Sequence, residues 1–297
     1  MYKSSFLLLI LFFLILSYFF PVFFSEFKSL IPFLLGLVMF AMAATLDISE
    51  IKNILKKPQW ILTTIFLQFS IMPILALSIS YIFNFPNEIA LGFIILGSCP
   101  GGTASNVIAY ICKANLSLSI FCTFASTGLA VLLTPFLIFF LANEQITINV
   151  ISIVKSTFYI ILLPVLSGLF LKIILRKKKF KYFKFFPFFS EIVIAFIIAV
   201  IFALNFDNLN NVSMLMVVGV VLHNLIGLIL ALLISIILKY PDDVKRTIAI
   251  EVGMQNSGLG MTLALLHFSK IVALPSAIFS LWHNISAAGL VYLWKKK

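Results

Sequence analysis

Residues 97–106 read GSCPGGTASN and interrupt an apolar segment, residues 89–112, that is long enough to cross a bilayer. Proline removes a backbone donor and clashes with the preceding turn, and glycine is costly inside a helix, so a helix breaks here. In lipid, a broken backbone is tolerated only where it is buried in protein or lines a watery cavity. The sequence therefore predicts a cavity at this break, to which Thr103, Ser105 and Asn106 supply oxygen atoms.

A second break lies in the other half of the chain, where residues 251–260 read EVGMQNSGLG. Each break follows a proline at the same spacing, because 15 positions separate Pro86 from Gly101 and also Pro241 from Asn256. Two interrupted apolar segments at corresponding places in two halves indicate the binding site of a secondary transporter. The alternative is a pair of glycine kinks for close helix packing, but packing does not explain the Glu, Gln and Asn side chains.

The composition is that of a polytopic membrane protein. Hydrophobic residues make up 62% and charged residues 10% of the chain, and the mean hydropathy is +1.18. A soluble domain is nearer half apolar and a quarter charged. The net charge of +11 comes from lysines in short loops, which indicates membrane topology and not nucleic-acid binding. Cys99, Cys112 and Cys122 lack metal-ligand spacing and are interpreted as small packing residues.

The apolar segments predict an all-α fold with ten transmembrane helices, at about 20 residues per span. A split after residue 142 leaves five helices in each half, residues 1–142 and 146–297, and an odd number inverts one half relative to the other. The predicted helices cover residues 4–24, 29–47, 59–84, 88–113 (broken near 100–102), 115–142, 147–175, 187–206, 212–239, 243–269 (broken near 253–256) and 272–294.

The positive charges predict the orientation. With the N-terminus inside, 18 of the 21 Lys and Arg residues fall on the cytoplasmic side, and only Lys28, Lys155 and Lys270 fall outside. So uneven a division supports an even number of spans with both termini in the cytoplasm. The first apolar run, residues 6–24, is too long for an ordinary signal peptide and lacks a cleavage site, so it is interpreted as a span.

Glu251 is the acidic residue that stands out. The other nine of the ten fall in loops or close to helix ends, whereas Glu251 falls near the bilayer midplane. A carboxylate at that depth costs several kcal/mol unless a cation or hydrogen bonds compensate it. Because no Lys or Arg lies at matching depth, a bound monovalent cation is the simplest partner. The alternative is a protonated Glu251 bonded to Gln255 or Asn256, which also admits proton coupling.

Oxygen-bearing residues near the breaks suffice for two cation cages, since hard cations prefer several oxygens, including the carbonyls of an unwound helix. On spacing alone, each of these polar residues is equally consistent with hydrogen bonding between helices. The first set comprises Glu251, Ser105 and Asn106, completed by Ser119 and Thr123, and the second comprises the Val252 and Met254 carbonyls with Gln255 and Gln68.

These motifs together resemble the bile acid:sodium symporter family, in its bacterial branch. The matching residues are 99–106 (CPGGTASN), Ser119 with Thr123, 251–256 (EVGMQN) and 282–284 (WHN). The resemblance implies a panel domain of spans 1, 2, 6 and 7 and a core domain of spans 3–5 and 8–10, in which the two broken helices cross. It also implies symport of an organic anion, either bile acids or smaller carboxylates such as pantoate or pyruvate.

The resemblance also assigns ligands for two sodium ions. It implies a first sodium site of Ser105, Asn106, Ser119, Thr123 and Glu251, and a second of Gln68, Glu251, Val252, Met254 and Gln255.

Four further residues are predicted to bind the substrate. After each break a half-helix begins, and its exposed N–H groups and positive dipole end favour a carboxylate, which Thr103 and Asn256 are placed to bind. His283 and Asn284 are expected to face the same cavity. Residues 223–224 (HN) suggest the same role with less support. Side chains that face the cavity from the panel helices are expected to be mostly Phe, Ile and Leu.

The predicted function is therefore sodium-coupled import of an organic anion by alternating access, in a bacterial inner membrane and as a monomer. Rivals are a proton-coupled or sodium/proton-exchanging carrier, a metalloid exporter that uses Cys99, and a receptor without transport. Hydroxyl and amide oxygens fit a hard cation better than a soft ligand, which disfavours the exporter. The sequence does not predict an enzyme, because no acidic pair, HExxH or GxSxG motif at membrane depth supports catalysis.

Overall fold

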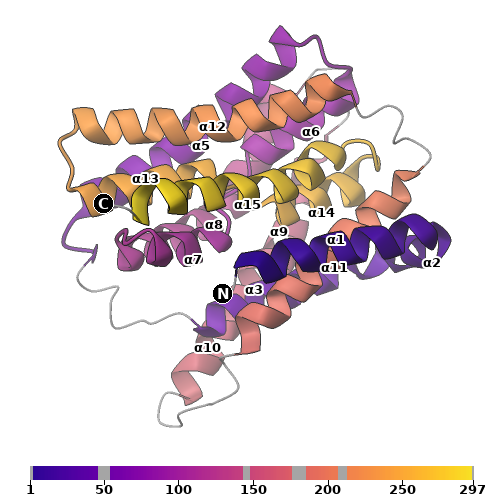
Figure 1. Cartoon of the computed structure of the whole chain (residues 1–297), viewed down its shortest axis with the longest axis horizontal. Coiled ribbons are helices and arrows are strands. Elements are labelled where there is room, and N and C mark those ends of the chain that lie inside the picture. The colour runs from indigo at the N-terminus through magenta and orange to yellow at the C-terminus, as the bar shows by residue number, and fades with distance from the viewer. Residues whose placement is uncertain (1–2, 46–53, 143–147, 176–184, 207–212, 296–297) are drawn as a thin grey trace.

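The computed structural model describes residues 3–45, 54–142, 148–175, 185–206 and 213–295, and every regular element in these ranges is helical (Figure 1). The predicted division of the chain after residue 142 and the basic run 176–184 lie outside the described residues. Within the described ranges, five helical segments are long and apolar enough to cross a membrane, namely Pro21–Thr45, Pro58–Ile82, Leu116–Leu141, Val150–Ile174 and Met214–Ile237.

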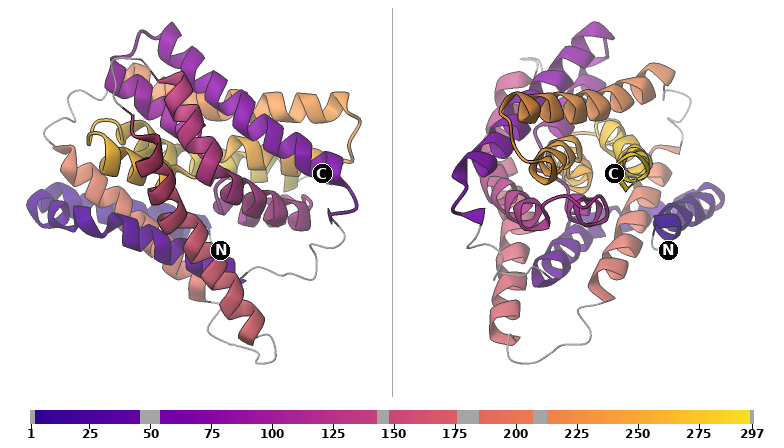
Figure 2. Two further views of the ribbon diagram at one scale, coloured as in Figure 1. Left: turned by 180° about the vertical axis from the view of Figure 1, so that it is seen from behind. Right: turned by 60° about the vertical axis from the view of Figure 1, so that its left-hand side comes forward.

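One group of helices gathers in the lower half of Figure 1, where α3 packs on α10 and α11, and α11 packs on α1. Figure 2 shows the same grouping from behind. Its elements are α1 (Lys3–Phe19), α2 (Pro21–Ser25), η1 (Glu26–Leu30), α3 (Ile31–Thr45), α9 (Val150–Thr157), η3 (Phe158–Leu162), α10 (Leu163–Leu175) and α11 (Phe186–Leu204).

The boundary predicted between the first two spans is wrong. A helix was expected over residues 4–24, but α1 ends at Phe19, and helical structure resumes at Pro21 and continues to Thr45. Phe20 leaves the helical region with φ −129° and ψ 54°. Pro21 then takes the first helical position, which suits proline because the missing N–H has no partner there.

A π-helical turn, η3, lies in the middle of the sixth predicted span. Pro164 has no N–H with which to bond the carbonyl four residues earlier, and the Leu163 N–H instead bonds the Phe158 carbonyl. The following turn approaches α3 closely. A β-carbon on Gly168 would lie 2.4 Å from the Phe40 carbonyl oxygen, so α10 and α3 meet through their backbones.

The second group of helices contains both interrupted segments. Its α12 packs on α5, α13 and α15, and α5 also packs on α6, α8 and α13. In Figure 1, α5, α6 and α12 lie across the top, and α13, α14 and α15 run below them. Its elements are α5 (Pro58–Ile82), α6 (Asn87–Gly97), α7 (Ala104–Ile111), α8 (Leu116–Leu141), α12 (Met214–Ile237), α13 (Asp242–Gly253), α14 (Ser257–His267) and α15 (Leu274–Lys295).

The same turn geometry precedes both interrupted segments. Helix α5 ends with Asn84 at φ 49° and a Phe85 N–H bond to the Ser80 carbonyl (3.0 Å). Helix α12 ends likewise, with Lys239 at φ 55° and a Tyr240 N–H bond to the Ser235 carbonyl (3.1 Å). This is the left-handed helix stop described for C-termini. Each member of the second turn lies 155 positions after its counterpart, as Pro241 does after Pro86.

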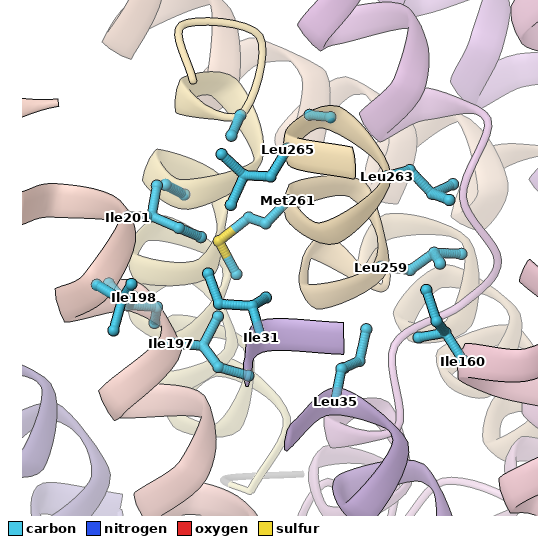
Figure 3. Close-up of a cluster of buried hydrophobic side chains, with 14 of the residues drawn as sticks. Ile31, Leu35, Ile160, Ile197, Ile198, Ile201, Leu259, Met261, Leu263 and Leu265 are labelled. Carbon is cyan, nitrogen blue, oxygen red and sulfur yellow. The ribbon is translucent and has the colours of Figure 1, made fainter. Parts of the chain in front are cut away.

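The two groups meet through a buried hydrophobic cluster. Figure 3 shows Ile31 and Leu35 of α3 facing Leu259 and Met261 of α14, with Ile197, Ile198 and Ile201 of α11 beside them. Along α3 this cluster extends from Ile31 to Ala43. In a membrane such side chains hold helices together by close van der Waals packing, since lipid is as apolar as they are. The cluster therefore joins the two groups along α3, α11 and α14.

Candidate functional site

The two breaks cross and bond to each other through their backbones. The Gly102 N–H bonds the Met254 carbonyl (2.6 Å) and the Asn256 N–H bonds the Pro100 carbonyl (2.8 Å), so that Gly101 and Gln255 form an antiparallel bridge. Backbone groups freed by a broken helix need partners inside a membrane. The bridge provides them, and it places the ends of four half-helices at one point.

Glu251 lies at this crossing, on the last turn of α13, and is buried. Its Oε1 accepts hydrogen bonds from Ser105 and Ser119 (both 2.5 Å), and its Oε2 accepts one from Thr123 (2.8 Å). Ser119 also bonds the Asn106 Oδ1 (2.8 Å). The structure thus brings together all five residues of the predicted first sodium site. Among the described residues, Glu251 forms no ion pair with Lys or Arg.

The sequence spacing explains why these hydroxyls converge. Ser119 and Thr123 are four positions apart on α8, so they lie on one face of that helix. Ser105 lies in the first turn of α7, directly after the break, and α7 packs on both α8 and α13. The Glu251 carboxylate therefore contacts hydroxyl groups from two helices, and all three of these hydroxyls donate hydrogen bonds to it.

A second polar cluster lies on the other side of the bridge. The Gln68 amide of α5 donates to the Cys99 carbonyl (2.9 Å) and to the Gln255 Oε1 (2.8 Å), and Gln255 donates to the Val252 carbonyl (3.3 Å). The Met254 carbonyl already accepts the Gly102 N–H. The structure thus connects Gln68, Gln255 and Val252 of the predicted second site directly, with Met254 in the adjoining bridge.

Asn224, for which sequence analysis found less support, lies beside this cluster. Its amide donates to the Gly253 carbonyl (2.8 Å), and its Oδ1 accepts from the Trp282 indole (3.1 Å). Gln68 and Asn224 therefore have the same structural role in the two halves, because the side-chain amide of each donates to a backbone carbonyl at the end of a broken helix. An Asn in the middle of an apolar helix is the sequence signal that marks it. His223 instead donates to the Met72 carbonyl (3.1 Å) inside the helix packing.

A cavity of about 250 Å³ opens next to the first cluster, between α3 and α10 on one side and α7 and α8 on the other. On the α7 and α8 side, four polar residues line the cavity among apolar ones, namely Thr103, Asn106, Thr123 and Thr127. No charged side chain lines the cavity in the described part of the chain. The remaining lining residues are Met39, Met42, Ala43, Thr45, Val107, Tyr110, Leu116, Ile120, Phe124 and Val165.

The α3 and α10 wall differs from the sequence expectation. Phe, Ile and Leu were expected, but this wall consists of Met39, Met42, Ala43, Thr45 and Val165. No motif marks these residues, because their positions depend on how α3 and α10 pack against the other group. Methionine is flexible and adapts to irregular contacts, which suits a wall that contacts a ligand.

Of the four predicted substrate-binding residues, Thr103 lines the cavity. It precedes the first turn of α7, and its hydroxyl forms no hydrogen bond within the described residues. Asn256 caps α14 by accepting the Leu259 N–H (3.1 Å), and its amide lies 3.9 Å from the sulfur of Met39, a cavity residue. Asn256 therefore borders the cavity without lining it.

His283 and Asn284 lie within α15 and do not line this cavity. The His283 Nδ1 donates to the Phe279 carbonyl (2.9 Å), and the Asn284 amide contacts the Ser280 carbonyl (2.7 Å) and the His283 Nε2 (3.1 Å). These bonds satisfy both side chains locally. Their assignment to the substrate stays a prediction.

Comparison with known proteins gives a consistent result. The sequence model of the Sodium Bile acid symporter family matches residues 32–212. The chain is 40% identical to the uncharacterized sodium-dependent transporter YocS of Bacillus subtilis, over 96% of this chain and 89% of that protein. It is 35% identical to the probable sodium/metabolite cotransporter BASS1 of Arabidopsis thaliana chloroplasts, over 88% of this chain and 66% of that protein. It is 28% identical to the ileal sodium/bile acid cotransporter of Cricetulus griseus, over 82% of this chain and 70% of that protein.

Proposed function

Because the chain belongs to the sodium bile acid symporter family, we propose that it imports a small organic anion with two sodium ions by alternating access. It is an integral membrane protein and a sodium-dependent transporter, not an enzyme. The proposal adds ten spans in two inverted repeats, a bacterial inner membrane with both termini in the cytoplasm, and function as a monomer. The repeated turns that precede the two breaks, 155 positions apart, support the repeat.

The observation that carries the proposal is the environment of Glu251. A buried carboxylate is costly unless its charge is compensated, and here three hydroxyls face it with no cationic side chain among the described residues. Sodium is a hard cation that takes hydroxyl, amide and carboxylate oxygens. The first sodium ion would therefore bind among Glu251, Ser105, Asn106, Ser119 and Thr123.

The second sodium ion would bind at the Gln68 cluster. The Gln68 amide nitrogen donates both of the hydrogen bonds that this side chain forms. Its Oε1 accepts none from the described residues and is therefore available to a cation. That oxygen, the Gln255 side chain and the carbonyls of Val252 and Met254 supply ligands of the type that sodium prefers, with Glu251 shared between both ions. Binding of both ions would stabilise the two breaks in their crossed arrangement.

The substrate would bind in the cavity beside the first ion. A carboxylate finds the Thr103 hydroxyl and the N-terminus of α7 there, and bound sodium supplies the positive charge that no lining side chain provides. The apolar wall of α3 and α10 suits an aliphatic body. At about 250 Å³ the cavity is smaller than the 300–1,000 Å³ typical of sites for drug-sized ligands, which favours a small carboxylate over a bile acid.

Alternating access would use the two ends of α3. Ile31 and Leu35 pack against Leu259 and Met261 of α14, and we call this contact the seal. Met42 and Thr45 line the cavity, and Met39 belongs both to the hydrophobic cluster and to the cavity wall. The end of α3 precedes a lysine-rich loop, residues 52–57, so the open end would face the cytoplasm. Movement of the α3, α10 and α11 group as a panel against the other helices would break the seal and close the cavity.

The membrane potential would drive this cycle. Two sodium ions with a monoanion carry one net positive charge, which contributes about 2.3 kcal/mol per 100 mV of membrane potential. The rival metalloid exporter loses support, because Cys99 is fully buried and does not line the cavity.

The test is thermal unfolding of the purified protein in detergent, with NaCl exchanged for KCl at constant ionic strength. A ligand that binds only the folded state stabilises it by RT ln(1 + [L]/Kd), so sodium is expected to raise the unfolding temperature specifically. Glu251→Gln is expected to abolish this response. If the unfolding temperature is the same in both salts and varies instead with pH, proton coupling would replace sodium coupling as the proposed mechanism.

A further inference from the structure

The turn between α7 and α8 is held by the first turns of α13. The Asn115 side chain donates to the Asp243 carboxylate (2.9 Å), and the Asn115 N–H donates to the Thr247 hydroxyl (2.8 Å). Asn115 also caps α8 by accepting the Leu118 N–H (3.0 Å). We refer to the contacts among Asn115, Asp243 and Thr247 as the inner clamp.

The inner clamp lies one helical turn from the Glu251 cluster on both of its helices. Ser119 follows Asn115 by four positions on α8, and Glu251 follows Thr247 by four positions on α13. One helical turn advances about 5.4 Å on each helix. The pair Asn115–Thr247 (2.8 Å) and the pair Ser119–Glu251 (2.5 Å) are therefore successive contacts between the same two helices.

This succession makes the clamp a determinant of register. If α8 slid or rotated against α13, Ser119 and Thr123 would leave the Glu251 carboxylate together, since both belong to α8. Side-chain geometry at an ion site must hold to within about 0.5 Å. The clamp prevents that displacement at the end of the helices, where the turn would otherwise be free to move.

A related clamp exists at the other end of the second group. The Ser269 hydroxyl donates to the Glu88 carboxylate (2.6 Å), which ties the turn after α14 to the second residue of α6. Glu88 precedes Asp243 by 155 positions, so the two acids are repeat counterparts. The counterpart of Glu251 on α6, however, is Leu96, which is fully buried and binds no cation. We refer to the contact between Ser269 and Glu88 as the outer clamp. It has the same form as the inner clamp but no ion site beside it.

We infer that Asn115 and Asp243 are positioning residues for the first sodium site. They touch neither ion nor substrate, and they act by fixing α8 against α13 so that the hydroxyls meet Glu251. The inference rests on the proposed function, because it assumes the sodium site at Glu251. It predicts that a substitution that disrupts the inner clamp weakens sodium binding, whereas the equivalent substitution in the outer clamp lowers the stability of the fold alone.

The experiment measures the sodium concentration for half-maximal thermal stabilisation and for half-maximal uptake. Asn115→Asp sets two carboxylates face to face while Asp still caps α8, and it is expected to raise both values about fivefold. Adding Asp243→Asn reverses the roles of the pair and is expected to restore both values to within about twofold. Ser269→Asp creates the matched like-charge pair with Glu88 and is expected to lower the unfolding temperature without changing the sodium values.

Three results would overturn the inference: an unchanged sodium requirement in Asn115→Asp, an equal rise in Ser269→Asp, or no recovery in the double variant. Thr247→Val weakens the clamp without adding charge, and it is expected to raise the sodium values in the same direction if Asn115→Asp does not fold. A wild type without any sodium-specific response overturns the proposed function instead, and the inference with it.

Discussion

Gly102 and Gln255 approach each other so closely that a β-carbon on Gly102 would lie 2.7 Å from the Gln255 carbonyl oxygen. Real β-carbons do not approach a carbonyl at this distance. The bridge between the two breaks therefore depends on the absence of a side chain at this position.

Gly102→Ala is expected to abolish sodium-dependent uptake and to lower the unfolding temperature, because the two breaks must separate to admit the methyl group. The matched control is Gly128→Ala on α8, where a β-carbon meets no atom within 4 Å. It is expected to leave uptake intact and to stabilise the helix by up to about 1 kcal/mol. Wild-type uptake by Gly102→Ala would show that the bridge is dispensable.

Asn224→Ala is expected to destabilise the protein by about 1–3 kcal/mol, because the Gly253 carbonyl and the Trp282 indole both lose their partner. Trp282→Phe removes only the second contact and is expected to have a smaller effect. Thermal unfolding in detergent compares the two variants. A greater loss of stability in Trp282→Phe than in Asn224→Ala would contradict a stabilising role for the Gly253 bond.

Met42→Ala is expected to enlarge the cavity on its α3 wall and to admit carboxylates with bulkier bodies than the wild type accepts. Competition by a series of carboxylates of increasing branching against labelled uptake measures this change. Leu62→Ala is the control, since Leu62 is 65% exposed on α5 and faces away from the cavity. A shift in the competition series for Leu62→Ala, or none for Met42→Ala, would remove Met42 from the substrate wall.

Gly168→Ala is expected to force α10 away from α3, because its β-carbon would lie 2.4 Å from the Phe40 carbonyl oxygen. The predicted result is a marked fall in unfolding temperature. At Gly36 on the same interface the nearest atom, of Pro164, is 3.5 Å away, an ordinary contact distance. Gly36→Ala should therefore leave the unfolding temperature nearly unchanged, and a similar loss in both variants would contradict this account.

The breaks and the polar side chains beside them could be predicted from sequence because each rests on local chemistry. Pro100 and the two glycines after it stop a helix wherever they occur, and Glu251 in an apolar segment needs compensation in any fold. Ser119 and Thr123 share a face by helical spacing alone. These local properties do not depend on how the remaining helices pack.

Features that depend on packing between distant segments could not be predicted in this way. Met42 and Val165 line the cavity only because α3 and α10 pack against the second group, and no local pattern encodes that contact. The boundary at Phe20 was missed because the prediction weighed the apolar content of residues 6–24 above Pro21, which disfavours a helical conformation at the residue before it. The inner clamp joins Asn115 to Asp243, 128 positions away, and no local pattern links these two residues.

The bridge between Pro100 and Asn256 also has a consequence for biosynthesis. Residues 100–102 leave the ribosome more than 150 residues before their partners, Met254 and Asn256, have been made. During that interval the first break is already in or near the membrane with its Pro100 carbonyl and Gly102 N–H unpaired, so the nascent chain must keep them hydrated or shielded until translation is nearly complete. A chain truncated before residue 254 leaves these two backbone groups without their partners permanently.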